Sequence, residues 1–183
     1  MNAQSELSRA SLRQLGAGDF QLDSVSFDTD TLKIRASSEF LFYPFGRFHN
    51  ISSLTKSISK PKLVRLAKRS LESNLPMEAD VSIVLVILAG DTVGVFEDDE
   101  RNRVEIAKGL IVNQSFELKK GIKVGMKKKD FLLRIFRTIP HFDIKGIKVV
   151  ELISTLDGMW HYYTFSNNIL KSIEFKTDCL VTY

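Results

Sequence analysis

A histidine and a glutamate near the C-terminal end are the residues whose types fit proton-transfer chemistry. The stretch DGMWHYYTFSNNILKSIEF places His161 and Glu174 on two apolar, aromatic runs joined by the pair 167–168, which is Asn-Asn. Such a pair between strand-like runs is typical of a two-residue type I′ turn, which would set His161 directly opposite Glu174. A carboxylate in that place raises the pKa of a histidine and orients it as a general base. The spacing therefore makes His161 and Glu174 the candidate catalytic pair of a hydrolase.

The rest of the chain offers this base neither a nucleophile nor a metal. No Gly-x-Ser-x-Gly elbow is present, and the single cysteine, Cys179, ends an apolar run that is typical of a buried thiol. His49 and His141 fall in predicted loops without a second ligand at metal-binding spacing. We therefore expect a non-catalytic protein without metal or cofactor, and the hydrolase remains a second alternative.

The same register divides the hairpin into two faces. Trp160 would face Phe175 and Tyr162 would face Ile173, which forms a cross-strand ladder. Each such pair contributes about 0.2–1 kcal/mol to sheet stability. The sequence thus predicts that Trp160 and Tyr162 belong to the core, and that His161 lies on the other face.

A lysine-rich segment leads into a predicted helix. Its cations are Lys119, Lys120, Lys123, Lys127, Lys128, Lys129, Arg134 and Arg137. Three lysines at a helix N-terminus (Lys127–Lys129) oppose the helix dipole, and a bound phosphate would relieve that conflict. Anion or nucleic-acid binding is therefore the first alternative function, with the hairpin aromatics stacking on bases. Because the chain also carries the acidic run 97–100 and a net charge of only +4, a solvated turn is favoured and nucleic acid is not the expected partner.

The segment YPFGRF, ahead of the first predicted helix, combines aromatic residues with a cation. Tyr43, Phe45, Arg47 and Phe48 are residue types that anchor protein interfaces. These four form the candidate protein-binding site. The alternative is a loop whose aromatics fold over the core.

Two helices are predicted to position these residues. In the first, Leu63, Leu66, Ala67 and Leu71 recur at helical spacing between Pro61 and Pro76. The second covers Met126–Thr138 and ends before a proline.

The remaining apolar runs predict strands separated by turn residues. We expect a hairpin on either side of residues 28–30, followed by strands over Asp80–Ala89, Thr92–Glu97, Arg103–Leu118, Ile147–Ser154, Met159–Phe165 and Ile169–Lys176. The fold class is then α+β, an antiparallel sheet covered by helices and built from two tandem helix-plus-three-strand units. We expect a flexible polar leader over 1–19, a first unit over 20–118 and a second over 119–183, packed as one compact body.

The second unit resembles a known family. The runs GIKVGMKKKDFLLRIF and MWHYYTFSNNILKSIEF are similar to the pattern of small bacterial envelope lipoproteins of the SmpA/OmlA (BamE-like) family and to the wider β-lactamase-inhibitor-protein-like (BLIP-like) fold. The residues that carry the match are Gly125, Met126, Phe131, Trp160, Tyr162 (or Tyr163), Phe165, Leu170, Ile173 and Phe175. The chain departs from the family at Lys127, where a capping Ser, Thr or Asp is usual. The resemblance implies a non-catalytic, protein-binding module of the bacterial envelope.

The compartment follows from the start of the chain and from its hydropathy. Asn2-Ala3-Gln4 resembles the junction that remains after a signal peptide is cleaved. The apolar run Val81–Gly90 is about half of the ~20 residues that a membrane helix needs. We therefore expect no membrane span, a periplasmic, outer-membrane-associated or secreted location, and another protein of the cell envelope as partner. A cytoplasmic location stays open, as does the oligomeric state.

Overall fold

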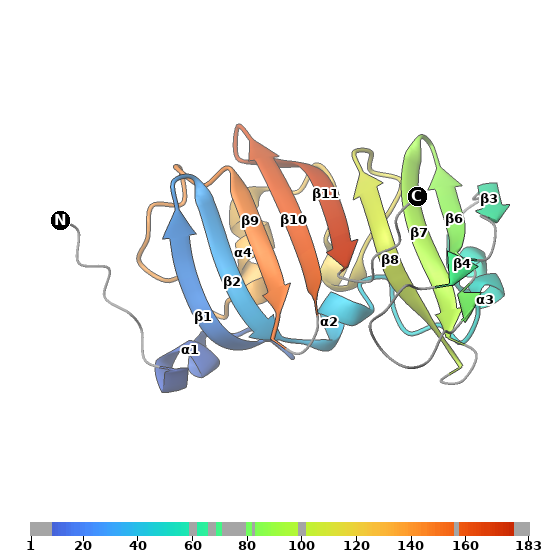
Figure 1. The fold of residues 1–183 in the computed structure, drawn as a ribbon. Coiled ribbons are helices and arrows are strands. Elements are labelled where there is room, and N and C mark those ends of the chain that lie inside the picture. Colours follow the sequence, from blue (N-terminus) through green and yellow to red (C-terminus); the bar gives the residue numbers. More distant parts are fainter. Residues whose placement is uncertain are drawn as a thin grey trace.

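The computed structural model describes residues 9–58, 62–65, 69–70, 80–81, 83–98, 102–155 and 158–177. Within these ranges the fold is α+β, with one large sheet and short helices on one of its faces (Figure 1). The strands of this sheet are β1 (Gln21–Asp28), β2 (Thr31–Ser37), β3 (Lys62–Arg65), β6 (Ile83–Leu88), β7 (Asp91–Asp98), β8 (Arg103–Ile111), β9 (Val149–Ser154), β10 (Met159–Ser166) and β11 (Ile169–Thr177). A separate pair is formed by β4 (Arg69–Ser70) and β5 (Asp80–Val81).

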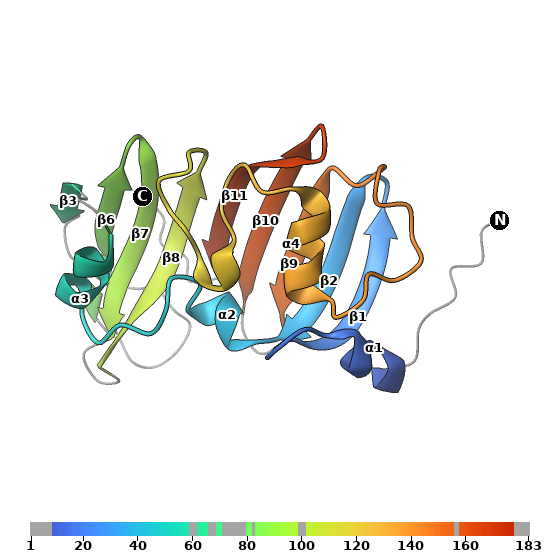
Figure 2. The same ribbon diagram turned by 180° about the vertical axis from the view of Figure 1, so that it is seen from behind.

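The order across the large sheet is β1-β2-β9-β10-β11-β8-β7-β6-β3. Its neighbours run antiparallel except for β2 and β9, which are parallel. That parallel contact joins the N-terminal hairpin to the C-terminal meander β9-β10-β11, and β11 in turn pairs with β8. The two expected three-strand meanders therefore share a single continuous sheet (Figure 2).

The helices are α1 (Arg9–Leu15), α2 (Glu39–Phe42), α3 (Ile51–Ser57) and α4 (Lys128–Ile135), and a 3-10 turn covers Lys119–Gly121. Figure 2 shows α2, α3 and α4 on one side of the sheet, which we call the inner face. The opposite side is the outer face. Over β1, β2, β9, β10 and β11, the described residues place no helix on it (Figure 1).

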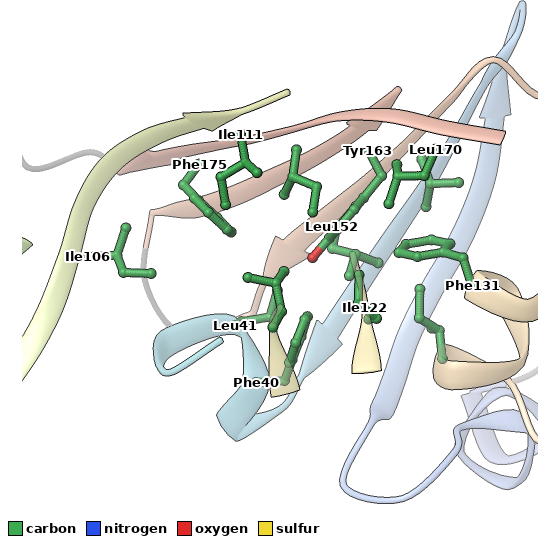
Figure 3. Packing of buried hydrophobic residues seen from close by; sticks show 14 of the residues in the cluster. Phe40, Leu41, Ile106, Ile111, Ile122, Phe131, Leu152, Tyr163, Leu170 and Phe175 are labelled. Carbon is green, nitrogen blue, oxygen red and sulfur yellow. The ribbon is translucent and has the colours of Figure 1, made fainter. Parts of the chain in front are cut away.

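The core lies between the inner face and these helices. Figure 3 shows Leu152, Tyr163 and Phe175 reaching from the strands toward Phe40 of α2 and Phe131 of α4. All five side chains are buried, and burying one such side chain contributes roughly 1.5–3 kcal/mol. The Phe131 and Tyr163 rings have centroids 4.5 Å apart, so α4 is held directly on β10.

The helix predicted over Met126–Thr138 is confirmed, but it is shorter. It ends at Ile135 because Phe136 is extended and makes a β-bridge with Gly16. The N-terminal hairpin is also confirmed, with Thr29 at φ 56° in its turn.

The helix predicted between Pro61 and Pro76 is wrong for the residues that are described. Lys62–Arg65 forms β3, which pairs antiparallel with β6, and Arg69–Ser70 forms β4. Tertiary pairing with an open strand edge overrides helix propensity here. The helix that precedes the strands is instead α3, where the Asn50 and Ser53 side chains form a capping box. Residues 61, 66–68 and 71–76 of the predicted helix lie outside the described residues.

The leader expected over 1–19 is corrected from residue 9 onward. Residues 9–15 form α1, in which Leu12 is buried. The Ala17 N–H donates to the Ile135 carbonyl at 2.7 Å, and Arg137 donates its N–H to the Leu15 carbonyl at 2.8 Å. The buried Leu12 and these two hydrogen bonds therefore hold the segment against the C-terminal end of α4. Residues 1–8 lie outside the described residues.

The predicted 167–168 turn is confirmed, because both asparagines have positive φ, 51° and 60°, as a type I′ turn requires. The register, however, shifts by one residue just beyond the turn. Thr164 faces Ser172, which leaves Lys171 as the extra residue of a β-bulge. Sequence spacing carries no signal for this extra residue.

The bulge exchanges the two predicted faces of β10. Trp160 and Tyr162 lie on the outer face and are half-buried. His161 lies on the inner face and faces Phe175 instead of Glu174. The prediction of a Trp160 and Tyr162 core ladder is therefore wrong, since a slip of one residue moves every side chain to the other face.

Candidate functional site

His161 is wholly buried and held by two hydrogen bonds. Its Nε2 lies 2.9 Å from the Leu41 carbonyl and its Nδ1 lies 3.0 Å from the Tyr163 hydroxyl. Because a carbonyl oxygen only accepts, Nε2 carries the proton, and Nδ1 of the neutral ring accepts from the tyrosine. Burial lowers the pKa of His161 to about 3, against the opposing effect of the Leu41 carbonyl. The ring is therefore neutral at physiological pH and ties α2 to β10.

The predicted His161–Glu174 pair does not form. Glu174 lies on the outer face, where its carboxylate is 3.1 Å from the Lys176 ammonium. The imidazole is enclosed instead by Phe40 and Phe175, with ring centroids 5.8 Å and 4.7 Å away. A base without access to solvent cannot meet a substrate.

The candidate protein-binding loop splits into packed and exposed residues. The Phe45 ring contacts Phe116 and Phe175 and belongs to the edge of the core. Phe48 also packs against the core. Arg47 is 70% exposed at its side chain and pairs with Glu39 at 3.0 Å. Its guanidinium lies 5.5 Å from the centre of the Tyr43 ring. Arg47 is therefore the exposed member of the four, and Tyr43, Phe45 and Phe48 are half-buried.

The three lysines of the candidate anion site also divide. Lys128 is 2% exposed, and its ammonium donates to the Ile144 carbonyl at 2.8 Å and to the Ile147 carbonyl at 2.5 Å. Desolvation lowers its pKa, and Asp143 opposes that shift. Lys128 is therefore a structural clamp on the loop before β9, whereas Lys127 and Lys129 are exposed.

A pocket adjoins these lysines. We call it the lysine pocket: a cavity of about 360 Å³ between the start of α4, the segment 144–145 and the turn 167–169. Lys127, Lys129 and Lys145 contribute to its lining together with Ile144 and Ile169.

The other lysines of the basic segment are neutralised locally. The ion pairs are Lys119 with Glu39 at 3.3 Å, Lys120 with Asp19 at 2.7 Å and Lys123 with Glu117 at 2.9 Å. Each partner carboxylate comes from the chain itself, so the segment does not form the continuous basic stripe that a nucleic-acid backbone requires.

Sequence reasoning missed the outer face, where side chains line up across five strands. Strand register places Arg35 beside Ile153, Ile153 beside Trp160, and Trp160 beside Lys176, which is next to Lys108 of β8. This cross-strand row, which we call the tryptophan row, has an apolar centre and cations at its ends. Among the described residues, Arg35 has no ion-pair partner.

The tyrosine row lies next to it. Tyr162 sits between Glu151 of β9 and Glu174 of β11, and Leu110 of β8 follows Glu174. Burial raises the pKa of Tyr162 to about 12, as do the charge and hydrogen bond of Glu151 and the charge of Glu174. The Lys176 ammonium lies 4.8 Å from the centre of the Tyr162 ring, and Leu110 is 51% exposed.

Alternation of residue types along β10 was the available signal for this surface. Both faces of the strand carry aromatic residues, so polarity alone did not tell them apart. The choice of face depended on the register, and the register depended on the bulge at Lys171.

Comparisons with family models, curated proteins and solved structures yield no match to this chain. No helix within the described ranges is both long and apolar enough to cross a membrane. Across the same ranges, no three His, Cys, Asp or Glu side chains gather to hold a metal ion. Cys179 lies outside the described residues.

Proposed function

We propose that this chain is a non-catalytic protein-binding module that docks a protein partner on its outer face. The observation that carries the proposal is the pair Trp160 and Tyr162, half-buried on a stretch of sheet that no described helix covers. Trp, Tyr and Arg are the residues that dominate binding energy at protein interfaces. The tryptophan row supplies all the elements of such a centre: an aromatic, an aliphatic neighbour and the cation Arg35.

The charges of the tryptophan row favour one kind of partner. Arg35 stands at one end of the row, and Lys176 and Lys108 stand at the other. A protein that presents an apolar side chain bordered by carboxylates would complement this pattern. We propose such an acidic surface as the partner.

Nucleic acid would use the same aromatics for stacking, but the tyrosine row opposes it. Glu151 and Glu174 flank Tyr162 on both sides. A continuous phosphate backbone would pass over these two carboxylates and be repelled, whereas a protein can place its own carboxylates only at the ends of the tryptophan row. The protein partner is therefore favoured over a single strand.

The buried, neutral His161 supports a role without catalysis. The ring that would act as base is bound on both nitrogens within the protein. The resemblance to the SmpA/OmlA family and to the BLIP-like fold supports a location in the bacterial envelope or outside the cell. It also supports the interpretation of α3 with β6–β8, and of α4 with β9–β11, as two related units.

Site-specific photo-crosslinking in cells tests the proposal. A photoreactive amino acid at position 162 is compared with the same group at Leu133, which is 42% exposed on α4. We expect one protein adduct from position 162 and none from position 133. The adduct should disappear when Arg35→Ala and Trp160→Ala are combined. Equal adducts from both positions, or a nuclease-sensitive adduct, would contradict the proposal.

A further inference from the structure

The lysine pocket is lined by cations that form no ion pair with other described residues. Lys127, Lys129 and Lys145 have no ion-pair partner among the described residues, although most other described lysines of the chain have one. Asp143 is the nearby carboxylate. It accepts the backbone N–H of Lys145 at 2.9 Å and is not part of the lining. The pocket therefore holds a local excess of positive charge.

The pocket is also an open hollow with room for a small molecule. Its volume of about 360 Å³ falls in the range of roughly 300–1,000 Å³ that small-molecule sites occupy. Lys128 also belongs to the lining, and its ammonium is held by the carbonyls of the 144–147 segment. Because that clamp joins the start of α4 to this segment, two walls of the pocket are held in place relative to each other.

The lining combines ammonium groups with apolar surface. Ile144 and Ile169 lie among the lysines. An apolar wall beside charges of one sign focuses their field on the cavity. A ligand that matches both features has an anionic end and an apolar or ring-shaped body.

We infer that the lysine pocket binds a phosphate monoester, with its oxyanion among Lys127, Lys129 and Lys145 and its organic body against Ile144 and Ile169. A lysine ammonium is a common phosphate ligand and acts as a point charge without strict geometry. The site includes no residue of the tryptophan row, so it is independent of the proposed docking surface. A phosphate monoester occurs both in soluble metabolites and in the headgroup of phosphatidic acid, and the two sources call for separate measurements.

The full chain is titrated with phenyl phosphate and followed by amide chemical shifts. Inorganic phosphate and phenol serve as the two halves of the probe. We expect saturable shifts at residues 127–129, 144–145 and 167–169, with phenyl phosphate binding about fivefold or more tightly than either half. Shifts that do not saturate, or that spread over exposed lysines elsewhere, would overturn the inference.

Charge-matched variants separate the pocket from general basicity. The pocket variant combines Lys127→Gln, Lys129→Gln and Lys145→Gln. The control combines Lys33→Gln, Lys56→Gln and Lys119→Gln, so both variants lose three positive charges. We expect the pocket variant to bind phenyl phosphate about tenfold more weakly and the control to stay within about twofold of the original chain. Equal losses in the two variants would overturn the inference.

Co-sedimentation with vesicles distinguishes the two sources of the ligand. Sedimentation with phosphatidic acid vesicles, but not with phosphatidylcholine vesicles, identifies the lipid headgroup if the pocket variant loses it. Saturable binding of phenyl phosphate without vesicle binding identifies a soluble monoester. Both results support the site. If the pocket variant still binds vesicles, and phenyl phosphate causes no chemical-shift changes at the pocket residues, the inference is contradicted.

Discussion

The two faces of β10 carry similar side chains with opposite roles. On the inner face, His161 and Tyr163 are fully buried and satisfy each other by a hydrogen bond of 3.0 Å. On the outer face, Trp160 and Tyr162 are half-buried and are bordered by charges of both signs. Residue type alone therefore does not separate core from surface on this strand. What separates them is the neighbour that each side chain contacts on the adjacent strands.

The largest expected contrast between the faces comes from removing one ring on each. His161→Ala leaves the Leu41 carbonyl and the Tyr163 hydroxyl without their partner and opens a cavity, so the free energy of unfolding should fall by about 3–5 kcal/mol. Trp160→Ala removes a half-buried ring and should cost about 1 kcal/mol. Urea denaturation measures both. Equal losses of unfolding free energy in the two variants would contradict the contrast between the inner and outer faces.

The two neighbouring lysines extend the same contrast to α4. Lys128→Met leaves the carbonyls of the 144–147 segment without a donor, and we expect a loss of about 2 kcal/mol. Lys129→Met removes an exposed charge and should change the free energy of unfolding by less than about 0.5 kcal/mol. Thermal unfolding of the two variants side by side provides the check. A larger effect of the exposed lysine would show that the clamp is misassigned.

A finer contrast comes from removing one hydroxyl from each tyrosine. Tyr163→Phe leaves Nδ1 of His161 buried without a donor, which should cost about 1–2 kcal/mol. Tyr162→Phe removes a half-buried hydroxyl beside Glu151 and should cost less than about 0.5 kcal/mol. The same denaturation measurement distinguishes them. If Tyr162→Phe were the costlier change, the assignment of the two faces would be reversed.

The elements of the C-terminal half were predictable because their patterns are local. Turn residues at 167–168 and apolar spacing through Phe131 and Ile135 encode a hairpin and a helix without help from distant parts of the chain. The face of β10 was not predictable, because the bulge at Lys171 is settled by how β10 and β11 fit over the core. The strand Lys62–Arg65 likewise forms because it pairs with the edge of β6. A contact between such distant segments leaves no local pattern in the sequence.

The candidate sites follow the same division. Lysine spacing indicated Lys127 and Lys129 correctly as exposed cations, but gave no sign that Lys128 turns inward to backbone carbonyls. Lys145 reaches the pocket from a loop and Arg35 reaches the tryptophan row through the parallel β2–β9 contact. Both are long-range consequences of the topology.

A further expected effect is on acid stability. Desolvation by burial raises the pKa of Asp19, but hydrogen bonds from Lys120 and Ser38, together with the charge of Lys120, outweigh it and lower that pKa from 3.8 to about 2. A carboxyl whose pKa is lower in the folded state stabilises the fold above pH 3.8, and this contribution is lost as the pH falls toward 2. Asp19→Asn should therefore weaken the pH dependence of the melting temperature between pH 4 and about 2. An unchanged slope would remove Asp19 from the set of groups that stabilise the fold.

The protonation state of His161 distinguishes the two assignments of the β10 faces most directly. If the ring lies on the inner face, its 15N signals show a proton on Nε2 and do not titrate between pH 5 and 8, because burial lowers the pKa to about 3. The same spectra of Glu174→Gln should be unchanged. Titration near the ordinary pKa of 6.5, shifted by Glu174→Gln, would instead place His161 opposite Glu174 on the outer face and contradict both the register and the proposed docking surface.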